Sequence, residues 1–220
     1  MYTLYGTTGS GAAVVAAALA VIGAQYRNVD ASSWDEGPGR DELARINPLV
    51  QIPTLILPEG TVMSESGAIL IELGLRHPES GLLPQEPAAR ARVIRGLVYL
   101  GANNYAATGI NDYPERWCDA ATEDDIARIR KGTQARAGWL WDVFADTFFH
   151  PTPAEPWLGG AQLNALDIMA AILSKWTGAR KHLAQSRPDF LALMLKIEKT
   201  GVMAEIQARY WPPEGPPDLA

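Results

Sequence analysis

Residues 47–55 read NPLVQIPTL, and residues 64–69 read SESGAI. In the first stretch, Ile52-Pro53 stands directly before a short strand expected at Thr54–Leu57. Most X-Pro bonds are trans, and an ordinary trans proline is one interpretation of this pair. The other is a cis proline that turns the backbone N–H and C=O of Ile52 outward, where they can pair with an extended peptide. The stretch is therefore a candidate binding edge for a peptide-like ligand.

In the second stretch, Ser64-Glu65-Ser66 opens a helix expected at Gly67–Leu75. Serine commonly caps a helix start, and plain capping is one interpretation. The other is a ligand site, because free amides at a helix start and the Ser66 hydroxyl suit a carboxylate, while Glu65 suits an ammonium group. A carboxylate and an ammonium on one carbon describe the head group of an α-amino acid.

The pattern around these two stretches predicts an α/β domain over residues 1–77. Hydrophobic periodicity and turn residues give the order β-α-β-α-β-β-α, in which the first three elements form a right-handed βαβ unit. The expected strands are Tyr2–Tyr5, Gln25–Val29, Thr54–Leu57 and Thr61–Met63, and the expected helices are Gly11–Ile22, Asp41–Ile46 and Gly67–Leu75.

The rest of the chain is expected to be all-helical. Residues 78–87 are rich in Pro, Gly and Glu, which predicts a linker and a second domain over residues 88–220. Helices are expected near residues 88–108, 123–148, 164–177, 188–199 and 201–209, followed by an irregular, proline-rich tail from Trp211 to Ala220. Asn164 and Asp167 have the spacing of a capping box, so Asp167 is expected to be buried and structural.

Thr7-Thr8-Gly9-Ser10-Gly11 lies between the first strand and the first helix. Ser10 or Thr8 can simply cap the helix. Gly9 and Gly11 supply two glycines of a dinucleotide loop, but Val14 stands where the third is needed, and no Lys-Ser or Lys-Thr pair follows. Both nucleotide-binding interpretations are therefore discounted.

Composition narrows the function classes further. The formal net charge is −6, without a basic cluster, which argues against nucleic acid or a membrane surface as partner. The apolar run from Ala12 to Ile22 has no basic residue before Arg27 and is too short to span a bilayer. The single cysteine, Cys118, predicts a cytoplasmic protein without disulfides, and the scattered His and Cys residues predict no structural metal.

The motifs NPxxxIPxL (47–55) and SESxAI (64–69), with the capping box at 164–167, resemble the glutathione transferase superfamily over nearly the whole chain. The resemblance implies an N-terminal thioredoxin-like domain and an all-α C-terminal domain. It implies that glutathione is the co-substrate and that two copies form a homodimer.

Residue by residue, the resemblance places the backbone of Ile52 on the cysteinyl part of glutathione and makes Pro53 the cis proline. Glu65 and Ser66 would hold the γ-glutamyl head group, and Gln51 lies near the position that meets the glycyl carboxylate. Many members have a basic residue at the position of Gln51, so weaker carboxylate binding is implied here.

In serine-type members a hydroxyl follows the first strand, and Ser10 is the best match by spacing, with Thr8 second. A thiolate-stabilising hydroxyl rather than a nucleophile is implied. No cysteine stands near residue 10, so a mechanism with an enzyme cysteine is disfavoured. The first helix also has none of the basic residues usual in the family.

The second-substrate pocket is expected to draw on the start of the helical domain; the candidates are Asn103, Asn104, Tyr105, Tyr113 and Trp117. For Tyr105 and Trp117, as for Tyr99, a role in the core or an interface is the competing interpretation. The expected reaction is attack of the glutathione thiolate on a largely apolar electrophile. A glutathione-dependent peroxidase, isomerase or dehalogenase stays open, as does a binding protein without turnover.

Overall fold

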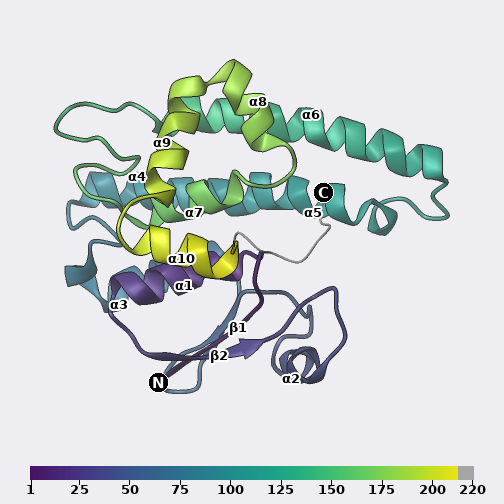
Figure 1. Ribbon diagram of the computed structural model, residues 1–220, viewed down its shortest axis with the longest axis horizontal. Coiled ribbons are helices and arrows are strands. Elements are labelled where there is room, and N and C mark those ends of the chain that lie inside the picture. Colours follow the sequence, from purple (N-terminus) through teal and green to yellow (C-terminus); the bar gives the residue numbers. More distant parts are fainter. Residues whose placement is uncertain (213–220) are drawn as a thin grey trace. The chain divides into compact units, whose positions relative to one another are not determined.

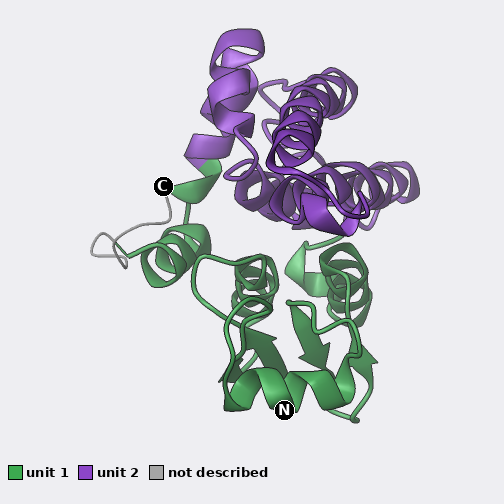
Figure 2. Cartoon of the chain, turned by 90° about the vertical axis from the view of Figure 1, so that its right-hand side faces the viewer, with its two compact units in different colours: residues 1–83, 197–220 green, residues 84–196 purple. Residues whose placement is uncertain are grey.

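The computed structural model describes residues 1–212, which divide into two compact units (Figure 2). The first comprises Met1–Leu83 together with the C-terminal segment from Ile197, and the second comprises Pro84–Lys196. The sequence-based boundary had placed all of residues 88–220 in the helical domain. No helix among the described residues is long and apolar enough to cross a membrane.

The first unit is built on a four-stranded mixed sheet with the order β2-β1-β3-β4. Strand β1 (Tyr2–Gly6) pairs in parallel with β2 (Tyr26–Asp30) and antiparallel with β3 (Thr54–Ile56). Strand β4 (Val62–Met63) completes a hairpin with β3. Because β1 lies between β2 and β3, the chain segments that adjoin those two strands lie on opposite sides of it.

Helices cover both faces of this sheet (Figure 1). Helix α1 (Ala12–Val21) consists only of Ala, Val and Leu and packs against α3 (Ser66–Arg76) and α10 (Val202–Tyr210). A Cβ atom at Gly6 would lie 2.1 Å from that of Ala12, so glycine is needed for the sharp turn from β1 into α1. On the opposite face, α2 (Pro38–Ile46) buries Leu43 against Tyr5 and Val29.

The second unit is helical throughout. Its helices are α4 (Pro87–Tyr99), α5 (Ala106–Asp112), α6 (Glu123–Phe148), α7 (Ala165–Leu173), α8 (Ala179–Ser186) and α9 (Pro188–Glu198), the last of which runs to the boundary with the first unit. Tyr99, Trp141, Phe144, Phe148 and Phe190 form an aromatic core with ring centroids 4.8–6.2 Å apart.

The expected fold class is confirmed, and the local structure adds detail to the sequence-based expectations in three places. The helix expected at residues 88–108 is interrupted by a π-helical segment, Leu100–Tyr105, before α5. Helix α8 was not predicted, because its exposed face is polar and only Ala179 and Leu183 are buried. The expected linker at residues 78–87 contains a 3₁₀ turn, Pro78–Ser80, and α4 begins at its last residue. Most of the predicted irregular tail, residues 213–220, lies outside the described residues.

The capping box at α7 is confirmed. Asp167 accepts hydrogen bonds from the backbone N–H groups of Asn164 (3.0 Å) and Leu158 (2.9 Å), and Asn164 Oδ1 accepts from Leu166 N (2.9 Å). Asp167 is completely buried, and this burial raises its pKa to about 7 because lost hydration outweighs the two donors.

Candidate glutathione site

The Ile52–Pro53 peptide bond is cis, as the family resemblance implied. The loop before it is held by two buried polar side chains. Asn47 Nδ2 donates to Gln51 O (3.2 Å) and Thr54 Oγ1 (2.9 Å), and Thr54 Oγ1 donates to Gln51 O (2.8 Å). The carbonyl of Gln51 is thus occupied within the loop, while its side chain is exposed.

Ile52 itself stands at the edge of the sheet, one proline before β3. Among the described residues, neither its N–H nor its C=O has a hydrogen-bond partner. The chain nearby is strained, since Val50 has a φ of 51° and a β-branched residue rarely adopts this region. Such strain is typical of binding loops whose backbone is presented to a ligand.

The hairpin register brings the second motif to the first. Leu55 faces Met63 and Ile56 faces Val62 in the β3–β4 pair. Continuing the same register by two residues sets Pro53 opposite Glu65. Opposed residues in an antiparallel pair have Cα atoms about 4.5–5.5 Å apart. Pro53 and Glu65, twelve positions apart in sequence, therefore lie at the same end of the hairpin.

Helix α3 begins at Ser66 without a side-chain cap. Glu65 precedes it with a φ of 66°, and Ser66 is only 5% exposed. In the described part of the chain, the Ser66 hydroxyl has no hydrogen-bond partner. The first N–H groups of a helix have no partner inside the helix, and they carry partial positive charge. This helix start is consequently suited to a carboxylate.

In the turn between β1 and α1, the two candidate hydroxyls differ in their burial and in their hydrogen bonds. Ser10 is 4% exposed, donates from Oγ to Thr7 O (2.6 Å) and accepts from Ala12 N (3.2 Å). Thr8 is exposed and has no recorded side-chain partner within residues 1–212. Gly9 N donates to Tyr210 O (2.9 Å), which ties the turn to the end of α10. The Ser10 hydroxyl is therefore engaged within the turn in this conformation, while the Thr8 hydroxyl is available.

The five residues expected in a second-substrate pocket all lie in the helical unit and do not share one cavity. Asn103 donates to Tyr99 O (3.1 Å) and lines an open groove of about 370 Å³ between the Ala102–Ile110 segment and α6. Asn104 is 3% exposed, with no partner for its amide among the described residues. Tyr105 packs at 6.4 Å from Trp176.

The other two candidates follow α5. The guanidinium carbon of Arg116 lies 3.9 Å from the centre of the Tyr113 ring. Trp117 is 64% exposed. Tyr105 thus has an aromatic neighbour in the helical unit and Trp117 is exposed, and their part in a second-substrate pocket stays a prediction.

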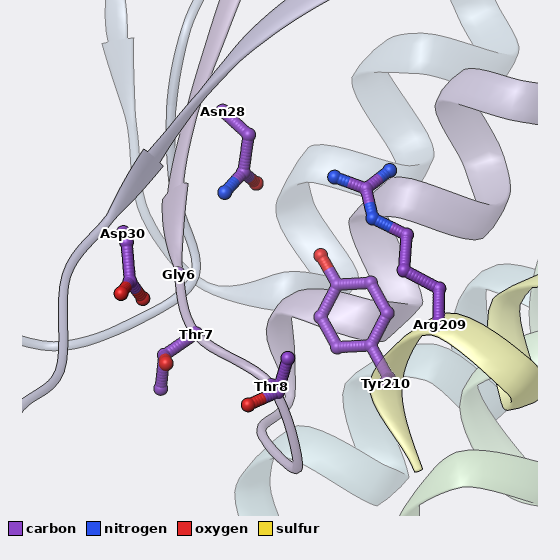
Figure 3. A pocket seen from close by; sticks show the side chains of 7 residues that line it. All are labelled: Gly6, Thr7, Thr8, Asn28, Asp30, Arg209 and Tyr210. Carbon is purple, nitrogen blue, oxygen red and sulfur yellow. The ribbon is translucent and has the colours of Figure 1, made fainter. Parts of the chain in front are cut away.

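A polar cavity of about 250 Å³ within the first unit was not predicted. Its lining residues are Gly6, Thr7, Thr8, Asn28, Asp30, Arg209 and Tyr210 (Figure 3). Only the Thr7–Thr8 pair was singled out from the sequence. Nothing in the sequence pattern connects β2 with the end of α10. Among the described residues, no group of three or more His, Cys, Asp or Glu side chains is placed to hold a metal ion.

Residues 1–71 match the model of the family "Glutathione S-transferase, N-terminal domain". The chain is 32% identical over 177 residues to the uncharacterized GST-like protein YncG of Escherichia coli K12, an alignment that covers 80% of this chain and 82% of that one.

Two further comparisons bear on the fold and on the reaction. A glutathione transferase homologue from Sulfitobacter, solved with bound glutathione, superposes with a TM-score of 0.80 at 20% identity and covers 94% of this chain and 97% of that one. A probable maleylacetoacetate isomerase of Caenorhabditis elegans is 34% identical over 103 residues, which are 46% of each chain.

Proposed function

The chain belongs to the glutathione S-transferase superfamily, and from this premise we propose that it binds glutathione and activates its thiol for attack on a small, largely apolar electrophile. The observation that carries the proposal is the juxtaposition of the cis Ile52–Pro53 bond with the uncapped start of α3 at Ser66. Such a reaction would serve the detoxification of reactive compounds.

In this proposal the tripeptide is held mainly by backbone groups. The free N–H and C=O of Ile52 pair with the cysteinyl residue, as in strand addition. The γ-glutamyl carboxylate accepts from the Ser66 hydroxyl and the first amides of α3, and Glu65 pairs with its ammonium. The exposed side chain of Gln51 meets the glycyl carboxylate with a neutral amide, which gives a weaker hold than a cation.

The turn after β1 provides the proposed thiol activation. A free thiol has a pKa of about 8.5, and lowering it by roughly two units takes about 2.7 kcal/mol in favour of the anion. One hydrogen bond to a charged group contributes about 1.5–3 kcal/mol, and a helix N-terminus adds roughly 0.3–1 kcal/mol. No acidic side chain in the first turn of α1 opposes this effect.

The hydroxyl comes from Ser10 or Thr8, and paired variants distinguish them. Ser10 must turn away from Thr7 O to donate to sulfur, whereas Thr8 needs no rearrangement. Replacing the responsible hydroxyl, by Ser10→Ala or Thr8→Val, is expected to raise the pKa of bound glutathione by about one unit. The thiolate absorbance of the complex, titrated against pH, measures this. If neither variant changes the pKa of bound glutathione, the turn does not have the proposed role.

The experiment that tests the function has two stages. Calorimetric titration with glutathione measures binding, and a conjugation assay with a generic aryl halide measures turnover. We expect both to be positive. Absence of glutathione binding would overturn the proposal, and binding without turnover of any electrophile would favour a non-catalytic binding protein.

A glutathione-dependent isomerase is the second candidate, favoured by the partial match to the maleylacetoacetate isomerase family. That chemistry regenerates glutathione, so turnover without net thiol consumption would identify it. Peroxidase and dehalogenase activities are distinguished by peroxide loss and halide release. We also propose that the protein is cytoplasmic and forms a homodimer. Light scattering on the purified protein measures its molar mass in solution and so tests the homodimer.

A further inference from the structure

The cavity beside β2 has the composition of a ligand site, and of the groups assigned to glutathione it contains only Thr8, one of the two candidates for the thiol contact. Asn28 and Asp30 lie on β2, whereas Pro53 leads into β3. Because β2 and β3 flank β1 on opposite sides, the cavity and the Ile52 edge lie on opposite sides of β1. The Thr7–Gly11 turn stands between them.

Tyr210 supplies the observation that points to a ligand. It is the last residue of α10 and is 4% exposed, yet its hydroxyl has no partner among residues 1–212. In Figure 3 its ring extends from the helix into the cavity, with the hydroxyl at the tip and the amide of Asn28 turned toward the same space. Burial raises the pKa of Tyr210, so the hydroxyl remains a hydrogen-bond donor.

The two walls of the cavity carry side chains of opposite charge. Arg209 is held by one hydrogen bond from its guanidinium to Tyr26 Oη (2.7 Å), and within the described chain no carboxylate pairs with it. A guanidinium has five N–H donors, so most remain for a ligand. On the other wall, Asp30 is an acceptor-only carboxylate without a recorded ion-pair partner in residues 1–212.

We propose that this cavity binds a small zwitterion of the α-amino acid type. Its carboxylate meets Arg209 and the Tyr210 hydroxyl, and its ammonium meets Asp30. The hydroxyls of Thr7 and Thr8 and the amide of Asn28 line the space left for a polar side chain. The volume of about 250 Å³ corresponds to roughly eight water molecules at about 30 Å³ each, which suits a single amino acid.

Three matched small molecules test, on the full chain, whether the cavity binds both the carboxylate and the ammonium of its ligand. They are L-alanine, propionate, which lacks the amine, and ethylamine, which lacks the carboxylate. Ligand-observed NMR titrations give the affinities. Because exposed ion pairs contribute about 0.2–1 kcal/mol, we expect L-alanine to bind about two- to fivefold more tightly than either half. Equal affinity for all three, or no binding of L-alanine, would overturn the proposal.

Variants assign each end. Arg209→Gln is expected to weaken L-alanine and propionate alike, about two- to fivefold. Asp30→Asn should weaken L-alanine by a similar factor while leaving propionate unchanged, and Tyr210→Phe should weaken both about threefold. Arg27→Gln is the matched control, because Arg27 is an exposed β2 arginine that pairs with Glu42 outside the cavity. If Arg27→Gln and Arg209→Gln weaken L-alanine binding equally, the effect comes from the net charge of the protein, and Arg209 is not part of the site.

Glutathione competition separates this site from the proposed function. We expect L-alanine to bind equally well with and without saturating glutathione. Displacement of L-alanine by glutathione would mean that one site holds both, and it would overturn the assignment of a separate site without affecting the proposed transferase.

Discussion

Helices α3 and α7 both follow a polar residue, Glu65 and Asn164, but their first turns are satisfied in different ways. At α7, Asn164 and Asp167 close the capping box with their own side chains, and both are buried. At α3, the residue before the helix gives no side-chain cap and the Ser66 hydroxyl is unpaired within the described chain. The capping box of α7 serves the fold, whereas the open start of α3 is the one proposed to take a ligand.

The largest expected effect is the pH dependence of stability that Asp167 introduces. Its folded pKa of about 7 is above the ordinary value of 3.8, so between these values the folded state binds more protons than the unfolded state. Stability therefore falls as pH rises through this window, by about 4 kcal/mol in total. Urea unfolding from pH 4 to pH 8 measures it.

Asp167→Asn is the control for this effect, because the amide does not titrate. Its unfolding free energy should be lower, since one backbone N–H loses its acceptor, but it should lack this slope. Carboxyl groups such as Asp146, whose pKa is lowered by Arg187, contribute to both proteins and cancel in the difference. Parallel pH profiles for the two proteins would show that Asp167 stays ionised in its capping box.

Next in size is the loss of glutathione affinity in Ser66→Ala. The hydroxyl is proposed to donate to a carboxylate, a bond that contributes about 1.5–3 kcal/mol, so affinity should fall roughly ten- to a hundredfold. Because Ser66 caps nothing, the denaturation midpoint should stay nearly unchanged. On the same variant, calorimetry measures the glutathione affinity and urea unfolding measures the denaturation midpoint. A destabilised variant with normal affinity would make Ser66 a structural residue.

Asn164→Ala should show the opposite pattern. Removing this cap leaves Leu166 N without its acceptor and costs about 1–2 kcal/mol of folding free energy. Glutathione affinity at a temperature where the protein is folded should not change. A drop in affinity equal to that of Ser66→Ala would mean that the two helix starts are not independent.

The smallest effect is a gain in stability from Glu65→Gly. Glu65 has a φ of 66°, a region that glycine adopts without steric cost, so relief of strain should add about 0.5–1 kcal/mol. Glutathione affinity should fall at the same time, because the proposed partner of the ammonium is lost. Thermal unfolding and calorimetry give the two values, and any loss of stability would contradict the strain at this position.

Prediction from sequence was most accurate where the chemistry is carried by the backbone and its neighbours in the chain. The cis Ile52–Pro53 bond was implied by the short motif that carries the family resemblance, and the start of α3 was expected from the serines at residues 64 and 66. The same holds for the capping box, whose members are three residues apart.

The sequence was less informative where function depends on which side chains meet in space. Ser10 matched by spacing, yet its hydroxyl is used by Thr7 O, a contact that spacing does not reveal. The second-substrate candidates were chosen from one stretch of chain, and the structure gives them different surroundings because a helix turns its residues in all directions.

By itself, the sequence determined the order of the first seven elements, the family and the backbone groups proposed to hold glutathione, since these depend on periodicity and on residues close together in the chain. Only the tertiary structure decided that α10 joins the N-terminal unit and that Arg209 and Tyr210 complete a cavity with Asn28 and Asp30. An amphipathic helix has the same periodicity whichever surface it covers, so its partner is chosen by packing across the whole chain.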